Sequence, residues 1–115
     1  MILFFRTPSK SVIATQADHQ LNKSEIDELS WLYGDAKLEE GERLDGYFVG
    51  PRREMITPWS TNAVEITQNM NLHGILRIEE YFPVGSKDAE HDPMLQRMYD
   101  GIDQDIFTVK HEPEP

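Results

Sequence analysis

Short apolar runs at the start of the chain predict an opening β element. Residues 2–5 and 11–15 are rich in β-branched and aromatic side chains, and residues 7–10 between them have the composition of a turn. A further run at 44–49, which Asp45-Gly46 interrupts and Gly50-Pro51 ends, indicates another strand. Residues 75–82 supply one more, although apolar and polar positions alternate poorly there. Together these runs predict a small sheet.

Helical spacing appears between and after these runs. A first helix is predicted from Ser24, which forms a capping-box-like pair with Asp27, to the stop signal Gly34-Asp35. Its apolar positions are Ile26, Leu29, Leu32 and Tyr33. A second helix opens within residues 57–62, where Ser, Thr and Asn all suit an N-cap and Asn62 has Glu65 three positions on. The side chains expected to face inward from it are Ala63, Ile66, Met70 and Val64.

A third helix is predicted over residues 92–107. Asp92-Pro93 forms a suitable N-cap and N1 pair, and Gly101 weakens the middle by about 1 kcal/mol relative to alanine. The apolar positions at helical spacing are Met94, Leu95, Met98, Tyr99, Ile102 and Ile106.

The order of elements, β(β)–α–β–α–β–α, favours an α+β fold with helices on one face of a small, mainly antiparallel sheet. A chain of 115 residues fits one domain, which we expect over residues 1–108. Residues 109–115 end in Glu-Pro-Glu-Pro and are predicted to start an extended linker to further domains.

The net charge of the chain limits the classes of molecule that it can bind. The chain has 21 acidic and 11 basic residues, a formal net charge of −10, so nucleic acid and anionic membrane surfaces are both disfavoured. The excess lies in residues 24–48 and 86–115, and we interpret it as solvated helix faces and a tail. No apolar run is long enough to span a membrane, and zero cysteines fit a reducing compartment. We therefore expect a soluble, cytoplasmic protein.

Catalytic motifs are not evident. The histidines at 19, 73, 91 and 111 lie far apart and form no zinc motif, and there is no phosphate-binding loop or hydrolase elbow. The acidic stretch around His91 could hold a hard cation, but it lacks the calcium-loop pattern. A small enzyme using His91 with Asp88 or Asp92 is a minor alternative. We predict no catalytic, cofactor-binding or metal site.

The segment 51–62 needs an explanation, because two adjacent arginines precede a tryptophan at a helix start. In one interpretation Trp59 is a core or staple residue, Pro58 fixes the approach and Ser60 is a cap. In the other, guanidinium groups, an indole and free helix amides form a surface for an anionic ligand or a partner domain. The candidate site residues are Arg52, Arg53, Thr57, Pro58, Trp59, Ser60, Thr61 and Asn62.

Residues 57–66, Thr-Pro-Trp-Ser-Thr-Asn-Ala-Val-Glu-Ile, followed by Asn69, resemble a signature of the N-terminal domain of phosphoribosylformylglycinamidine synthase in its large multidomain form. Arg77-Ile78-Glu79 resembles the family's Arg-(Ile/Leu)-Glu strand, and residues 92–107 with their proline-rich exit resemble the segment leading to its linker. The resemblance covers nearly the whole chain and is strongest over residues 51–80.

The resemblance implies a place in de novo purine synthesis. In this family, a glutaminase domain releases ammonia to an ATP-dependent synthetase domain, which converts formylglycinamide ribonucleotide to formylglycinamidine ribonucleotide. The N-terminal domain is similar to a dimer of the small stand-alone subunit of split enzymes, which implies a ferredoxin-like, pseudo-dimeric arrangement. Catalytic, ATP-binding and magnesium-binding residues lie in later domains, so none is expected here.

The family role of the domain is a non-catalytic scaffold that contacts the synthetase and glutaminase domains of the same polypeptide. By that resemblance, residues 52–62 are expected to lie against the synthetase domain near its nucleotide substrate, with Arg52 or Arg53 available to phosphate or carboxylate groups. An alternative from another class is a stand-alone ferredoxin-like module that senses a ligand or dimerises. The length of the parent polypeptide separates the two, and exposed partner surfaces predict weak self-association of the excised domain.

Overall fold

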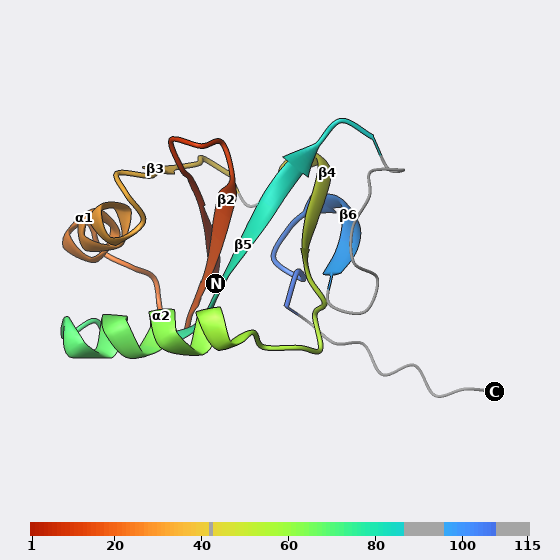
Figure 1. Ribbon diagram of the computed structural model, residues 1–115. Coiled ribbons are helices and arrows are strands. Elements are labelled where there is room, and N and C mark those ends of the chain that lie inside the picture. Colours follow the sequence, from red (N-terminus) through yellow and green to blue (C-terminus); the bar gives the residue numbers. More distant parts are fainter. Residues whose placement is uncertain (42, 87–95, 108–115) are drawn as a thin grey trace.

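The computed structural model describes residues 1–41, 43–86 and 96–107, and these form six strands and two helices, each helix lying between two pairs of consecutive strands (Figure 1). The expected α+β class is confirmed. The sheet has the order β3-β1-β2-β5-β4-β6, and every neighbouring pair is antiparallel, consistent with a ferredoxin-like arrangement. The elements are β1 Ile2–Arg6, β2 Val12–Ala17, α1 Lys23–Leu32, β3 Lys37–Leu38, β4 Leu44–Pro51, α2 Pro58–Asn69, β5 Ile75–Val84 and β6 Gln96–Ile102.

The strand β5 joins two halves of the sheet. Its first part pairs with β2, from Ile75 opposite Ala17 to Tyr81 opposite Val12, and its last residues pair with β4, from Phe82 opposite Val49. The sheet curls strongly, so that residues following β6 reach back to β1. There the Gln104 side chain accepts a hydrogen bond from Ile2 N at 2.7 Å and donates one to Ile2 O at 2.8 Å.

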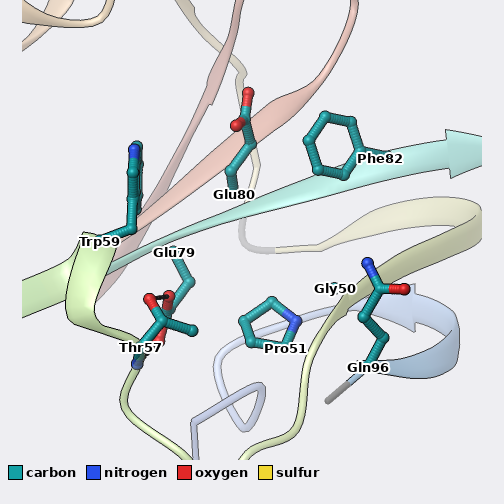
Figure 2. Close-up of a pocket in the computed structure, with 8 residues that line it drawn as sticks. All are labelled: Gly50, Pro51, Thr57, Trp59, Glu79, Glu80, Phe82 and Gln96. Carbon is teal, nitrogen blue, oxygen red and sulfur yellow. Dashed lines mark hydrogen bonds between the residues drawn. The ribbon is translucent and has the colours of Figure 1, made fainter. Parts of the chain in front are cut away.

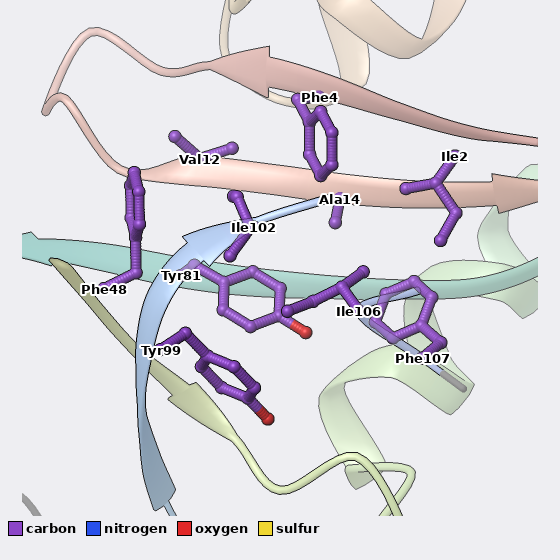
Figure 3. Close-up of a cluster of buried hydrophobic side chains, with 10 residues drawn as sticks. All are labelled: Ile2, Phe4, Val12, Ala14, Phe48, Tyr81, Tyr99, Ile102, Ile106 and Phe107. Atoms are coloured by element: carbon purple, nitrogen blue, oxygen red, sulfur yellow. The ribbon is translucent and has the colours of Figure 1, made fainter. Parts of the chain in front are cut away.

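The two faces of the curled sheet hold separate cores. The helices α1 and α2 cover one face, where buried residues include Phe5, Ile13, Leu29, Leu72 and Ile78. The opposite face encloses its own cluster, with side chains from five strands and the turn after β6 (Figure 3). That second cluster comprises Ile2, Phe4, Val12, Ala14, Phe48, Tyr81, Tyr99, Ile102, Ile106 and Phe107. The expected placement of helices on one face is thus confirmed.

The N-cap of the first helix lies two residues before the predicted capping residue, Ser24. Asn22 is the N-cap: its side chain accepts from Glu25 N at 2.8 Å, and the Glu25 carboxylate accepts from Asn22 N at 3.1 Å. This is a complete capping box. The prediction of Ser24 with Asp27 was wrong, because Asn22 and Glu25 have the same three-residue spacing and also adopt the required geometry.

A pH-sensitive contact precedes this cap. His19 Nδ1 lies 2.7 Å from Asp18 Oδ1, and His19 Nε2 lies 3.1 Å from Glu25 Oε2. The hydrogen bond with Asp18, followed by that with Glu25, raises the pKa of His19 above its ordinary value of 6.5. Since the folded pKa exceeds the unfolded one, the contact stabilises the protein fully below the unfolded pKa, and this stabilisation is lost as pH rises through the folded pKa.

We therefore expect His19→Gln to reduce the free energy of unfolding more at about pH 5.5 than at about pH 8.5. Urea denaturation at both pH values measures the difference, and His73→Gln, which alters an exposed histidine, is the matched control. An equal loss at the two pH values would show that protonation of His19 does not contribute.

The second helix is capped by Thr57, with Pro58 in its first turn. Asn62 is exposed within the helix, so its predicted capping pair with Glu65 does not form the start. Ala63, Val64 and Met70 pack against the core under the helices, as expected. Ile66 is 45% exposed, which contradicts its predicted inward position, because the helix contacts the sheet through the neighbouring stripe that contains buried Ser60 and Thr67.

The predicted third helix was wrong over residues 96–102, which form β6 beside β4, and over residues 103–107, which contain a turn. Residues 92–95 and the predicted linker, residues 109–115, lie outside the described residues. Tyr99 and Ile102 are both buried in the same cluster although they are three positions apart. Gly101, at φ +82°, breaks the strand alternation between them. Because of this break, two residues three positions apart share one face of a strand, although such a spacing is typical of a helix. No helix in the described ranges has the length and apolar character to cross a membrane.

Candidate functional site

A buried ion pair on β5 organises the entrance to α2. Arg77 Nε and Nη2 lie 3.1 and 3.0 Å from Glu79 Oε2. The side chains of Arg77 and Glu79 are only 6% and 1% exposed. Each charge is tolerated in the interior because the other compensates it and further hydrogen bonds satisfy the remaining donors and acceptors.

Arg77 also fastens the loop before α2 to the sheet. Its Nη1 donates to the backbone carbonyl of Arg53 at 2.7 Å, and its Nη2 donates to that of Met55 at 2.8 Å. The guanidinium carbon lies 4.5 Å from the centre of the Phe107 ring, a cation–π contact with the turn after β6. One side chain therefore connects β5, the loop of residues 52–55 and the C-terminal part of the described chain.

Glu79 holds the first turn of α2. Its carboxylate accepts from Thr57 N at 3.2 Å and from Thr57 Oγ1 at 2.7 Å, while Thr57 Oγ1 accepts from Ser60 N at 3.0 Å. Ser60 is buried, and its Oγ accepts from Ile78 N at 3.0 Å. The protein's own carboxylate thus already occupies the positively polarised helix start.

Thr57→Ala is expected to lower the free energy of unfolding by about 2 kcal/mol, because it removes both the helix cap and a donor to a buried carboxylate. Thr57→Ser keeps both hydrogen bonds and should stay within about 0.5 kcal/mol of the wild type. Chemical denaturation of the two variants measures this difference. Equal losses of stability in the two variants would instead assign the effect to the methyl group of Thr57, which both variants lack.

The two arginines predicted for ligand contact are engaged within the domain. Arg52 forms an ion pair with Glu54, with 2.7 Å between Nε and Oε1. Arg53 Nε donates to the carbonyl of Ile106 at 3.1 Å, and its guanidinium carbon lies 5.2 Å from the centre of the Tyr99 ring. The remaining predicted residues, Pro58, Trp59, Thr61 and Asn62, are exposed in the first half of α2. Trp59 is 45% exposed and so is not the core residue of the first interpretation; Thr57, not Ser60, is the cap.

A groove lies beside the exposed indole of Trp59, and we call it the Trp59 groove (Figure 2). Its volume is about 430 Å³. Trp59 and Phe82 stand on either side of Glu80, and β4 contributes Gly50 and Pro51 to the opposite wall. The full lining is Gly50, Pro51, Thr57, Trp59, Glu79, Glu80, Phe82 and Gln96.

A second hollow, the Leu76 groove, borders the same helix and has a volume of about 410 Å³. It is lined by Ile56, Ser60, Thr61, Val64, Glu65, Gln68 and Leu76. The exposed fractions are 62% for Ile56 and 54% for Leu76, and 45% and 49% for Trp59 and Phe82 of the first groove. Four large apolar side chains are therefore exposed around the first half of α2.

Sequence reasoning missed most of this surface. Leu76 and Phe82 are exposed on β5 and Glu80 is partly exposed between them, but the poor alternation of that strand hid which positions share a face. The Arg77-Ile78-Glu79 pattern was noticed only through its resemblance, because two charged residues on one strand face normally indicate a face exposed to solvent. No group of three potential metal ligands occurs in the part of the chain that the structure describes, and Asp88, His91 and Asp92 lie outside it.

Fold and site together define a small α+β domain in which a buried ion pair holds a capped helix between two exposed grooves. A sequence model of the formylglycinamide ribonucleotide amidotransferase N-terminal family matches residues 10–112. The chain belongs to this family, the N-terminal domains of formylglycinamide ribonucleotide amidotransferase, also called phosphoribosylformylglycinamidine synthase. This confirms the resemblance in the sequence, and the matched span contains both grooves and the Arg77–Glu79 pair.

Proposed function

We propose that this domain is a non-catalytic docking scaffold that couples the glutaminase and synthetase domains of the parent amidotransferase. The observation that carries the proposal is the set of exposed apolar side chains Ile56, Trp59, Leu76 and Phe82 around one helix. Apolar patches of this kind, rimmed by polar groups, are typical of protein interfaces. The buried ion pair beneath them supports this role, because it presents the side chains on a rigid base.

The charges of the site favour a protein partner over a direct contact with nucleotide phosphate. Arg52 and Arg53 already contact Glu54 and Ile106, and Glu79 neutralises the helix start from within the domain. An incoming phosphate would meet the Glu80 carboxylate in the Trp59 groove. In this proposal, ATP and magnesium therefore bind to other domains of the parent enzyme. The parent enzyme acts in purine synthesis in the cytoplasm.

The proposal is tested in the full-length amidotransferase with Trp59→Ala and Leu76→Glu. Truncation or charging of a central interface residue typically costs 2 kcal/mol or more, so glutamine-dependent product formation should fall by about thirtyfold. Product formation from added ammonia should fall much less, because it needs no transfer between domains. Trp31→Ala, which alters the 69%-exposed tryptophan of α1, is the matched control.

Unchanged glutamine-dependent activity in both variants would contradict docking through this surface. The self-association predicted for the excised domain is measured separately by sedimentation. A tight dimer that Leu76→Glu dissociates, combined with a parent polypeptide that ends near residue 115, would favour the stand-alone dimerising module instead.

A further inference from the structure

Among the residues that the structure describes, Glu80 of the Trp59 groove has no cationic partner. Its Oε2 accepts a hydrogen bond from Ser11 Oγ at 2.6 Å, and no lysine, arginine or histidine of the described residues forms an ion pair with it. The other acid of the groove, Glu79, is compensated by Arg77. Within the described part of the chain, the Trp59 groove therefore carries one uncompensated negative charge, which lies between Trp59 and Phe82.

The chemistry of the groove fits a planar cation. Trp59 and Phe82 stand on either side of Glu80, and the face of the Trp59 ring is turned toward Glu80 (Figure 2). An aromatic face attracts a cation, and the carboxylate pairs with it. A guanidinium group satisfies both, since it stacks on aromatic faces and forms paired hydrogen bonds with a carboxylate, whereas an ammonium group is a more strongly hydrated point charge. A groove of about 430 Å³ accommodates such a side chain together with its adjoining backbone.

We propose that the Trp59 groove receives an arginine side chain from a docking partner, with its guanidinium paired to Glu80 and placed against Trp59 and Phe82. This inference rests on the proposed docking function and specifies the chemistry of the partner. It replaces the anionic ligand expected from Arg52 and Arg53 with a cationic one. The net charge of −10 also favours a cationic partner, over a longer range.

The first test uses the 115-residue chain and the capped tripeptide acetyl-Gly-Arg-Gly-amide as the probe. Nuclear magnetic resonance titration should show saturable shifts of the Trp59 indole N–H and of the Gly50 and Phe82 amides. Glu80→Gln, which keeps an acceptor for Ser11, should weaken binding about fivefold or more. Glu28→Gln removes the same charge from the exposed face of α1, outside both grooves, and should leave binding unchanged.

Two further peptides define the recognised group. The citrulline peptide keeps the shape of arginine without its charge, and it should show no saturable binding. Equal binding of the citrulline peptide, or of the lysine peptide, would overturn the assignment of a guanidinium site. Shifts that Glu80→Gln leaves unaltered, or that cluster outside the groove, would overturn it as well.

A second test separates this inference from docking in general. In the full-length enzyme, Glu80→Gln should reduce glutamine-dependent activity about fivefold with ammonia-dependent activity retained. If Trp59→Ala and Leu76→Glu uncouple the enzyme but Glu80→Gln does not, docking stands and the arginine site is refuted. If Glu80→Gln lowers the activity only because it unfolds the domain, the thermal unfolding midpoint of the variant falls. The titration of the unchanged chain with the arginine and citrulline peptides then decides whether the guanidinium site exists.

Discussion

Replacing Arg77 with methionine is expected to lower the free energy of unfolding by about 3–5 kcal/mol, because Glu79 then remains as an uncompensated charge in the interior. The carbonyls of Arg53 and Met55 also lose their donor. The loop of residues 52–55 should therefore loosen together with the start of α2. Urea denaturation measures the loss, and amide hydrogen exchange of the first turn of α2 locates it.

Arg52→Met is the matched control, since it removes the same charge from a 41%-exposed side chain and should cost less than about 1 kcal/mol. The double replacement Arg77→Met with Glu79→Leu should recover part of the loss, because no unpaired ion is left buried. If Arg77→Met costs no more than Arg52→Met, the pair does not organise the helix entrance.

The second large effect is expected at Gly50, where β4 passes close to the Tyr81 ring. A Cβ atom there would lie 2.2 Å from Tyr81 Cδ1 and 2.5 Å from Cε1. Tyr81 is fully buried in the cluster shown in Figure 3, with its ring centre 5.5 Å from that of Tyr99, so it has little room to move. Gly50→Ala should therefore cost about 3 kcal/mol through overpacking.

Gly85→Ala is the control for the loss of a glycine as such, because a Cβ there meets nothing within 4 Å. It should change the free energy of unfolding by less than about 0.5 kcal/mol. Both variants are compared by thermal and urea denaturation. A cost for Gly50→Ala as small as that for Gly85→Ala would mean that the Tyr81 ring shifts freely, which the close packing of the cluster argues against.

Both predictions concern the base on which the proposed docking surface rests. Arg77 and Glu79 fasten the start of α2 from below, and Gly50 lets β4 approach β5 closely enough to form a wall of the Trp59 groove. The large side chains proposed to dock, in contrast, are exposed and apolar. A defect in docking from Trp59→Ala is therefore separable from a defect in folding from Arg77→Met, because only the second should shift the unfolding transition strongly.

Local signals were sufficient for much of the fold. Apolar runs placed β1, β2, β4 and β5, and the cap-forming residues within 57–62 marked the region where α2 starts, because turn residues, caps and short β-rich runs act over a few positions. The family signature in residues 57–66 also needed only the sequence, and the match to residues 10–112 confirms it. The sequence alone thus determined the class of fold, most elements and the family.

Tertiary structure decided what local spacing left ambiguous. Tyr99, Ile102 and Ile106 fit a helix by spacing, but β6 forms because β4, about fifty residues earlier, offers a partner strand and Gly101 permits the break in alternation. The same holds for the candidate site. Whether Arg53 or Arg77 is buried, and whether Trp59 faces the core or solvent, depends on contacts between distant segments, such as those of Ile106 with Arg53 and of Phe107 with Arg77. Such contacts exist only once the sheet has curled, so no short window of sequence contains them.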